Sequence, residues 1–266
     1  MSESDSSHEM TFWDHLDVLR RMLFRVAIVV ALLMIAAFCA KDFVFGTVIF
    51  SPASSDFCLY RGLCNLGEML NMPGFCPEPF RIEIININLA AQFFTHMSTS
   101  FWIGVIIGFP YLLYEIWKFV CPALYAKEKR YIRIAFGFGA VLFFMGVLLG
   151  YFVIFPLTLK FLGTYQVTET VVNQVALHSY ISTFTSLILI MGIVFEMPMV
   201  ALILSQLGVI HRAFLRKYRK HAIVGSLILA AIITPSGDAF TMIMVGLPLI
   251  LLYEFSILLV KKKQAE

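Results

Sequence analysis

The sequence is dominated by apolar runs, most of them about as long as a membrane-spanning helix. A helix needs about 20 residues to cross the hydrocarbon core of a bilayer, so each run is a candidate span. The chain is 60% hydrophobic and 14% charged, whereas soluble domains are about 45–50% apolar and about 25% charged. These features indicate an all-α integral membrane protein. The runs cover residues 22–40, 89–120, 132–155, 180–207, 222–233 and 240–260.

The last two runs leave two topologies open. Residues 222–260 must hold two crossings and the turn TPSGD at 234–238, and the run 222–233 is too short for a normal bilayer. If both runs cross, the bilayer is locally thinned or neighbouring helices cap the short one. If they instead form a re-entrant hairpin, the C-terminus changes side.

The basic residues decide between these topologies, because Lys and Arg gather on the cytoplasmic side of membrane proteins. Of the 20 Lys and Arg residues, 16 fall on one face of a six-span arrangement, at 20–25, 118–133, 212–220 and 261–263. A five-span arrangement would break this pattern. We therefore expect six spans and two cytoplasmic termini in a single domain of residues 1–266. The first 16 residues are polar and acidic, unlike a secretory leader, so the first run is expected to be retained.

The loop at 41–88 lies on the outer face in this topology and is expected to cap it. It holds Cys58, Cys64 and Cys76. A disulfide is permitted outside the cytoplasm, so we expect one bridge and one free thiol. The loop contains no histidine, which argues against a metal site there.

Two Gly-x3-Gly pairs occur within the spans, Gly104/Gly108 and Gly146/Gly150. Such small residues let membrane helices approach closely. We expect both pairs to pack within the same bundle, and a face for a partner subunit is the alternative.

No residue pattern in the sequence is typical of an enzyme. The histidines at 15, 96, 178, 211 and 221 are scattered over different helices and both faces, and no HExxH, GxSxG or phosphate-binding glycine loop is found. No long basic run with interleaved aromatics points to nucleic acid. We therefore expect neither catalysis nor a cofactor or metal ion.

Glu196 is the most informative polar residue within a span. A carboxylate in hydrocarbon is costly, so it should face the bundle interior, a wet cavity or a partner. Pro198 removes one helix hydrogen bond and kinks the span beside it. A role in binding a polar partner and a plain hydrogen bond to Ser or Thr of a neighbouring helix both remain open. Further along, Asp238 is expected to cap the sixth helix.

The segment 109–133 connects two spans on the cytoplasmic side and is the most chemically varied interfacial stretch. Glu128 lies there within a belt of basic residues, and Asp14 and Asp17 precede the first span on the same face. These carboxylates either pair internally with Arg20, Arg21 or Lys127, or bind a cationic ligand, because carboxylates bind guanidinium groups bidentately. Aromatic side chains nearby either anchor the apolar part of such a ligand or form the interfacial belt: Phe12, Trp13, Trp117, Phe119 and Tyr125.

Several stretches carry a resemblance to a known family. They are HLDVLRRML at 15–23, FPYLLYEIWKFVCPALYAKEKR at 109–130, GYFVIFPLTLKFL at 150–162, FEMP at 195–198, and IITPSGD with GLPLILLYE within 232–254. In this order and in a six-span chain, they resemble the TatC family, which belongs to the twin-arginine translocase.

The resemblance implies a concave, glove-shaped bundle of six helices with short fifth and sixth helices, in the inner membrane of a bacterium. It implies a receptor and core subunit that binds the twin-arginine signal peptides of folded proteins. Export would use the proton-motive force and single-span TatA- and TatB-type partner subunits, with several copies of this chain in the complex and lipids around it.

The resemblance also assigns residues to the signal-peptide site. Glu128 is the carboxylate expected to contact the arginine pair, with Phe119 and Tyr125 on the adjoining surface. Asp17 and Arg20 belong to the amino-terminal part of the same site.

Other residues match positions within the membrane. Glu196 corresponds to an intramembrane glutamate, and Thr234, with Asp238 after it, lies where partner helices dock. Pro52, Pro110 and Pro156 match prolines that shape loop and helix ends.

The amino-terminal motif departs from the family pattern. The usual HLxELR reads HLDVLR here, so Val18 stands at the glutamate position and Asp17 comes one residue earlier. One step along a helix rotates a side chain by about 100°, which leaves open whether Asp17 replaces that glutamate. The TPSGD turn is also one residue longer than the commonest form, and the loop at 41–88 is longer than usual.

A proton- or ion-coupled secondary transporter of a small solute is the alternative function, with Glu196 as the proton or ion site. Such transporters commonly show internal repeats, and none is found in this sequence. The few charged residues within the spans also favour the translocase receptor.

Overall fold

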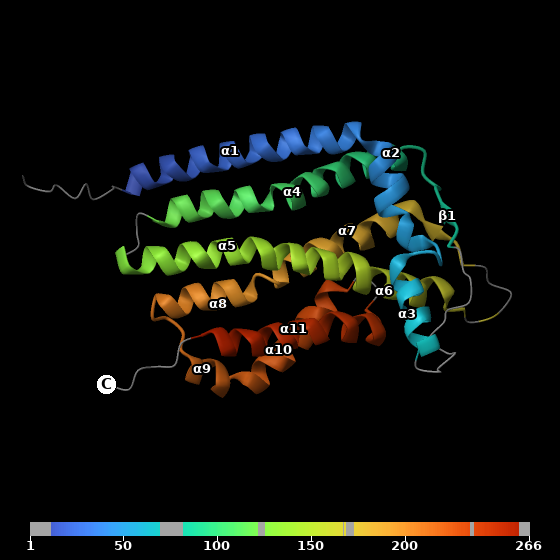
Figure 1. The fold of residues 1–266 in the computed structure, drawn as a ribbon. Helices are drawn as coiled ribbons and strands as arrows, with labels where there is room; N and C mark the ends of the chain where they lie inside the picture. Colours follow the sequence, from blue (N-terminus) through green and yellow to red (C-terminus); the bar gives the residue numbers. More distant parts are fainter. Residues whose placement is uncertain are drawn as a thin grey trace, which may run out of the picture.

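The chain folds into a bundle of long helices that lie roughly side by side, with most of the short elements gathered at one end (Figure 1). The computed structural model describes residues 12–69, 82–121, 126–166, 168, 173–234 and 237–260. The long helices are α1 (Phe12–Cys39), α4 (Ala91–Val120), α5 (Ala126–Leu149), α7 (Leu177–Val194), α8 (Met197–Gln206), α10 (Arg219–Ile233) and α11 (Ala239–Leu259). The predicted helical membrane architecture is therefore confirmed.

The short elements complete the chain. They are α2 (Lys41–Phe43), the π-helix η1 (Val44–Ile49), the 3₁₀ turn η2 (Ser51–Ala53), α3 (Cys58–Met69), β1 (Ile84–Ile85), the π-helix η5 (Gly150–Ile154), α6 (Phe155–Thr164), β2 (Val175–Ala176) and α9 (Arg212–Lys217). The two strands pair in parallel, with Ile84 opposite Val175 and Ile85 opposite Ala176. This pairing joins the end of the long loop to the start of α7.

Five segments within the described ranges are long and apolar enough to cross a membrane: Leu16–Cys39, Ala91–Val120, Ile132–Thr164, Leu177–Gln206 and Ala239–Leu259. The fifth predicted span corresponds to α10, which has 15 residues and packs against α11. It is shorter than the roughly 20 residues of an ordinary crossing. The expectation of a short sixth helix is wrong, because the apolar run of α11 continues for 21 residues.

The third predicted span also ends too early. The structure continues helically from α5 through η5 into α6, so the segment reaches Thr164 rather than residue 155. Pro156 lies in the first turn of α6, directly after the π-helix. A proline lacks the N–H that an α-helix needs, and the wider π-helical turn accommodates its absence.

The bundle has two chemically different ends (Figure 1). At one end lie the start of α1, the end of α4, the start of α5, α9 and the end of α11, so both ends of the described chain lie at this end of the bundle. We call it the basic end, because it carries Arg20, Arg21, Lys118, Lys129 and the basic residues of α9. The opposite end, which holds α2, η1, η2, α3 and β1, is the capped end.

Three tyrosines fasten the long loop to the capped end. The Tyr60 hydroxyl donates a 2.7 Å hydrogen bond to the carbonyl of Pro156. The Tyr151 hydroxyl donates to Val48 at 2.9 Å and the Tyr180 hydroxyl to Ile49 at 2.6 Å. Pro52 is buried in η2 beside these contacts. The loop therefore covers this end of the bundle, as predicted.

The cysteines of this loop follow the predicted pattern in the described part of the chain. Cys64 is disulfide-bonded, and Cys58 is an exposed free thiol. Cys76 lies outside the described residues. A structural bridge favours an oxidising compartment at the capped end.

Both glycine pairs pack within the bundle, as predicted. A Cβ atom on Gly146 would lie 2.4 Å from the carbonyl oxygen of Met191 in α7, and one on Gly104 would lie 2.9 Å from the backbone nitrogen of Met34 in α1. Real Cβ atoms do not approach so closely. The absence of a side chain at Gly146 therefore allows the close approach of α5 to α7, and its absence at Gly104 allows that of α4 to α1.

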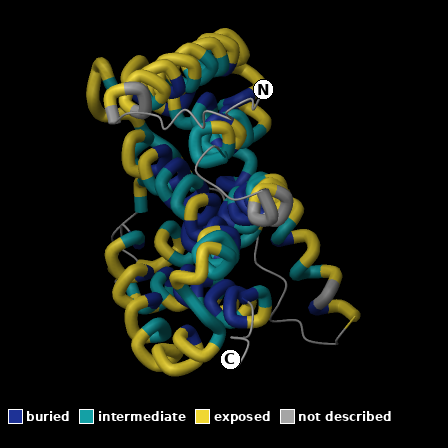
Figure 2. The backbone as a smooth tube through the Cα atoms, turned by 90° about the vertical axis from the view of Figure 1, so that its left-hand side faces the viewer, coloured by how far each residue is buried: buried dark blue, intermediate teal, exposed yellow. Residues whose placement is uncertain are grey.

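The buried core centres on α7, whereas α1 is largely exposed. Buried residues gather in the middle of the bundle and exposed ones around it (Figure 2). Large apolar side chains of α1 such as Phe24, Ile28 and Leu32 are more than half exposed. A contiguous apolar exterior of this kind suits a lipid environment rather than water.

Candidate functional site

The two helix ends that carry most of the predicted signal-peptide segment, the end of α4 and the start of α5, lie at the basic end. Glu128 lies in the first turn of α5, and Phe119 is half-buried near the end of α4. The side chain of Glu128 and the whole of Tyr125 lie outside the described residues, as do the side chains of Phe12, Asp14 and Lys127. The structure thus places the segment, and the contacts of Glu128 stay a prediction.

A small cavity of about 400 Å³ lies beside this segment. Its lining combines aromatic rings and ammonium groups from the end of α4 and the start of α5: Tyr114, Trp117, Lys118, Cys121 and Lys129. The Trp117 ring lies 5.7 Å from that of Phe136 in α5. The arrangement presents an apolar surface with a basic rim next to the first turn of α5.

Asp17 forms an internal pair at the basic end. Its carboxylate lies 3.9 Å from the guanidinium of Arg21, one turn further along α1, and both side chains are more than half exposed. Exposed pairs of this kind contribute little to stability, so such a carboxylate is readily available to another cation. Arg20 is exposed beside it. A joint site of Asp17 and Glu128 stays a prediction, because the Glu128 side chain lies outside the described part.

Sequence reasoning missed a buried carboxylate at this end. Glu115 of α4 is only 4% exposed, and Arg25 of α1 places its Nη1 atom 3.4 Å from Oε1 and 3.3 Å from Oε2. The Tyr111 hydroxyl donates a 3.0 Å hydrogen bond to Oε1. An acid and a base that each lie inside a predicted apolar run were the available signal, because ionised groups within a membrane pair with one another.

Glu196 lies at a break between α7 and α8. α7 ends at Val194 and α8 begins at Met197 with Pro198 in its first turn, so the predicted interruption is confirmed. The side chain is 7% exposed, and neither carboxylate oxygen has a hydrogen-bond partner among the described residues. Oε2 lies 2.8 Å from the point where a Cβ on Gly139 of α5 would be. The carboxylate therefore faces α5, and the alternative of a hydrogen bond to Ser or Thr is not found among the described residues.

The turn before α11 is organised by Asp238. One carboxylate oxygen accepts a 2.7 Å hydrogen bond from the Thr241 backbone nitrogen, and the other accepts one of 2.7 Å from the Thr241 hydroxyl. This geometry confirms the predicted helix cap. Thr234 is 4% exposed, and its hydroxyl donates a 3.4 Å hydrogen bond to Ala231 in its own helix.

The prolines differ in their placement. Pro52 and Pro156 lie in the first turns of η2 and α6, as expected for residues that shape element ends. Pro198 lies in the first turn of α8, directly after the interruption of the fourth predicted span. Pro110 instead lies inside α4, so its prediction as an end-shaping residue is wrong. The helix continues through this proline, and the neighbouring Phe109 ring stacks on Phe143 of α5, with centroids 3.6 Å apart.

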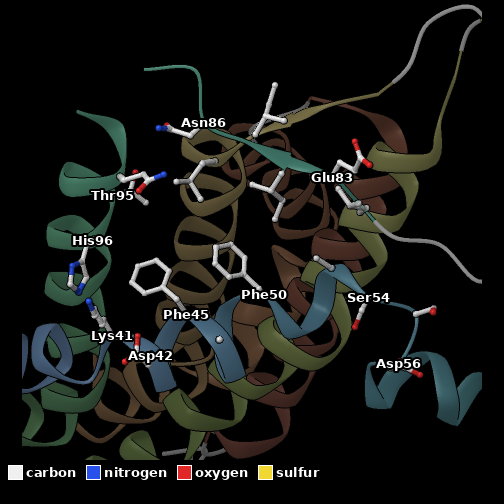
Figure 3. Close-up of a pocket in the computed structure, with 18 residues that line it drawn as sticks. Lys41, Asp42, Phe45, Phe50, Ser54, Asp56, Glu83, Asn86, Thr95 and His96 are labelled. Atoms are coloured by element: carbon white, nitrogen blue, oxygen red, sulfur yellow. The ribbon is translucent and has the colours of Figure 1, made fainter. Parts of the chain in front are cut away.

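A second cavity, of about 1360 Å³, opens at the capped end (Figure 3). β1 with Glu83 and Asn86 borders one side, α4 with Thr95 and His96 borders another, and Phe45 lies between them. The volume exceeds the roughly 300–1,000 Å³ of a typical small-molecule site. Glu196 does not line it. Among the described residues, no group of three or more His, Cys, Asp and Glu side chains could hold a metal ion.

Comparison with known proteins gives one family. A family model described as "Sec-independent protein translocase protein (TatC)" matches residues 14–248. The Sec-independent protein translocase protein TatC of Blattabacterium sp. subsp. Periplaneta americana (strain BPLAN) is 38% identical over 255 residues, which cover 95% of this chain and 96% of the relative.

Solved structures agree with this result. A crystal structure of the twin-arginine translocase receptor TatC in DDM is similar with a TM-score of 0.73 and 32% identity, covering 93% of this chain and 99% of that chain. A second crystal structure of the receptor gives a TM-score of 0.68 at 32% identity, covering 92% of this chain and 97% of that one. The chain is therefore a member of the TatC family of Sec-independent protein translocases.

Proposed function

We propose that this chain is the receptor and core subunit of a twin-arginine translocase, which binds twin-arginine signal peptides and exports folded proteins with the proton-motive force. The observation that carries the proposal is the family match over residues 14–248, which includes the connection between α4 and α5. Solved receptors of this name share 32% identity over 92–93% of this chain. The small-solute transporter is not favoured by these findings, and we expect no catalytic activity.

The proposed topology has six spans in a single domain of residues 1–266, with both termini in the cytoplasm of a bacterium and the chain in its inner membrane. The gathering of basic residues at one end supports this orientation, because Lys and Arg mark the cytoplasmic side. The bonded Cys64 supports an outer location for the capped end. In this topology α10 is a short membrane crossing that packs against α11.

Signal recognition is proposed at the basic end. Glu128 pairs with an arginine of the signal, while Phe119 and Tyr125 contact its apolar part. Asp17 and Arg20 contribute from the start of α1. The support is a carboxylate within a basic belt, beside a cavity with aromatic walls. A guanidinium is the cation that carboxylates bind most specifically, because its planar fork donates two parallel hydrogen bonds.

Partner subunits are proposed to dock along α10 and α11. Thr234, at the end of α10, and Asp238, before α11, mark this region, and Glu196 offers a buried carboxylate without a described partner. The apolar part of the signal would extend from the basic end towards Glu196. Single-span TatA- and TatB-type subunits, further copies of this chain and lipids are the expected neighbours, and we expect no cofactor.

Photo-crosslinking of a twin-arginine peptide to the full chain tests the recognition site. Glu128→Gln is expected to lower crosslinking about tenfold, because a hydrogen bond between charged groups contributes roughly 1.5–3 kcal/mol. Glu68→Gln in α3, at the capped end, is the matched control and should leave crosslinking unchanged. A wild-type chain that captures a twin-lysine peptide as well as a twin-arginine peptide would refute the proposed recognition.

A further inference from the structure

The pair formed by Arg25 and Glu115 has the geometry of a partly used guanidinium site. Only Nη1 of Arg25 reaches the carboxylate, at 3.3 and 3.4 Å from its two oxygens. A guanidinium that is bound side-on donates two parallel hydrogen bonds of about 2.7–2.9 Å. The internal contact is therefore longer than the best that this carboxylate can make, and it engages one nitrogen instead of two.

The two partners differ sharply in exposure. The side chain of Glu115 is 5% exposed, whereas that of Arg25 is 46% exposed. Arg25 is thus the accessible partner of the pair, whereas Glu115 is enclosed. Tyr111 holds Oε1 from the α4 side with its hydroxyl, which fixes the carboxylate while the Arg25 side remains exchangeable.

Exchange of one guanidinium for another is energetically inexpensive at this position. A buried carboxylate without a cation carries a large desolvation penalty, so simple loss of Arg25 is unfavourable. Replacement by a second arginine keeps the charge balance, and the half-exposed Arg25 can extend its guanidinium towards the lipid headgroups on release. A lysine substitutes poorly, because its ammonium is a point charge that cannot bind side-on.

Glu115 also lies where the proposed ligand arrives. It is five residues before Val120, the last residue of α4, which corresponds to about 7.5 Å of helix rise. Glu128 lies just beyond the same connection, in the first turn of α5. Two neighbouring arginines need two acceptors, and these carboxylates lie on the two helices that meet there.

We propose that Glu115 is a second arginine-binding carboxylate of the receptor, that Arg25 occupies it in the free protein, and that an arginine of the bound signal peptide displaces Arg25. This proposal rests on the proposed function, because it requires a ligand with two arginines. In this arrangement Arg25 competes with the ligand for Glu115. A cationic peptide without arginine does not displace Arg25 and therefore does not gain this contact.

The test measures binding of a synthetic twin-arginine peptide, and of its twin-lysine analogue, to the purified full chain in detergent. Arg25→Met removes the competitor and is expected to tighten twin-arginine binding about three- to tenfold. Glu115→Gln removes the acceptor and is expected to weaken binding by a similar factor. The double variant should behave like Glu115→Gln alone, because Arg25 acts only through that carboxylate. Twin-lysine binding should stay unchanged in all variants.

Opposite signs for the two single variants are the decisive readout. If both weaken binding, or if Arg25→Met leaves it unchanged, the pair merely holds α1 against α4 and the proposal is wrong. Should Arg25→Met fail to fold, Arg25→Gln, which keeps a hydrogen-bond donor, takes its place with the same expected sign. Glu128→Gln distinguishes failure of the proposed receptor function from failure of the proposed exchange at Glu115. Loss of twin-arginine binding in this variant tests the receptor function independently of the Arg25 and Glu115 variants.

Discussion

The hydroxyl of Tyr60 in α3 donates a 2.7 Å hydrogen bond to the carbonyl of Pro156, 96 residues further along the chain. Burial raises the pKa of the Tyr60 phenol, so the hydroxyl stays protonated and remains a donor at physiological pH. This contact ties the long loop to the joint between η5 and α6. Deletion of one atom, the Tyr60 hydroxyl oxygen, would remove this contact.

Tyr60→Phe should destabilise the capped end. The lost hydrogen bond is expected to cost about 0.5–1.5 kcal/mol, because the phenylalanine ring keeps the packing but not the donor. Thermal unfolding and limited proteolysis of the loop measure the effect. Tyr165→Phe is the control, because that ring is 64% exposed and should tolerate the change. Equal stability of the two variants would show that the hydrogen bond contributes nothing.

Gly146→Ala should disrupt the contact between α5 and α7. Its new methyl group would meet the Met191 carbonyl oxygen at 2.4 Å, a backbone atom that cannot rotate away. We expect a lower unfolding temperature in detergent and less folded protein in the membrane. Gly137→Ala, in the same helix, meets nothing within 4 Å and should be neutral or stabilising by up to about 1 kcal/mol. An unchanged Gly146→Ala chain would contradict the packing.

Glu196→Gln should separate stability from function. The amide is nearly isosteric and carries no charge to desolvate, so the isolated chain should be at least as stable as wild type. Under the proposed function, association with single-span partner subunits and transport should fall. Glu254→Gln is the contrasting variant, because it removes the carboxylate partner of Arg219 and should lower stability slightly. Full transport with Glu196→Gln would remove the proposed role.

Asp238→Ala should weaken the start of α11. The loss of an N-cap costs about 0.5–2 kcal/mol, because the Thr241 N–H loses its acceptor. Asp238→Asn keeps a side-chain oxygen and should restore most of the stability. Thermal unfolding distinguishes the two, and equal losses would show that the charge matters rather than the cap.

The free thiols allow the orientation to be measured. Cys58 is exposed at the capped end, and Cys121 follows α4 at the basic end. In the variant Cys39→Ser/Cys121→Ser, Cys58 is the remaining free thiol of these three. A membrane-impermeant maleimide should label this variant in intact cells. A chain that keeps only Cys121 of these three should be labelled after the membrane is opened. The reverse result would overturn the proposed topology.

Local patterns predicted much of the fold. The apolar runs located the long helices, the Gly-x3-Gly pairs located the close contacts of α4 and α5, and Asp238 was recognised as a cap from its position before an apolar run. Each of these features is encoded within a few neighbouring residues. The π-helix η5 that precedes Pro156 has no comparable local signal in the sequence. The predicted helix end at residue 155 was therefore wrong.

The sequence did not show which residues of distant segments contact each other. Arg25 and Glu115 are 90 residues apart, and Arg25 alone could be interpreted only as a charge that marks the cytoplasmic side. The pairing of β1 with β2 joins two-residue strands that have no periodicity to detect. For Glu128, the family resemblance gives a predicted role, while the structure gives the place of its helix.

The hydrogen bond from Tyr180 to Ile49 joins residues 131 positions apart, and that from Tyr151 to Val48 joins residues 103 apart. Contacts of such separation form late, because the intervening chain must exist before its ends can meet. During synthesis η1 therefore gains its first tyrosine anchor only when η5 has left the ribosome, and its second only when α7 has followed. Closure of the capped end marks the moment when more than half of the chain is in place, and it offers a visible milestone for following assembly of the bundle.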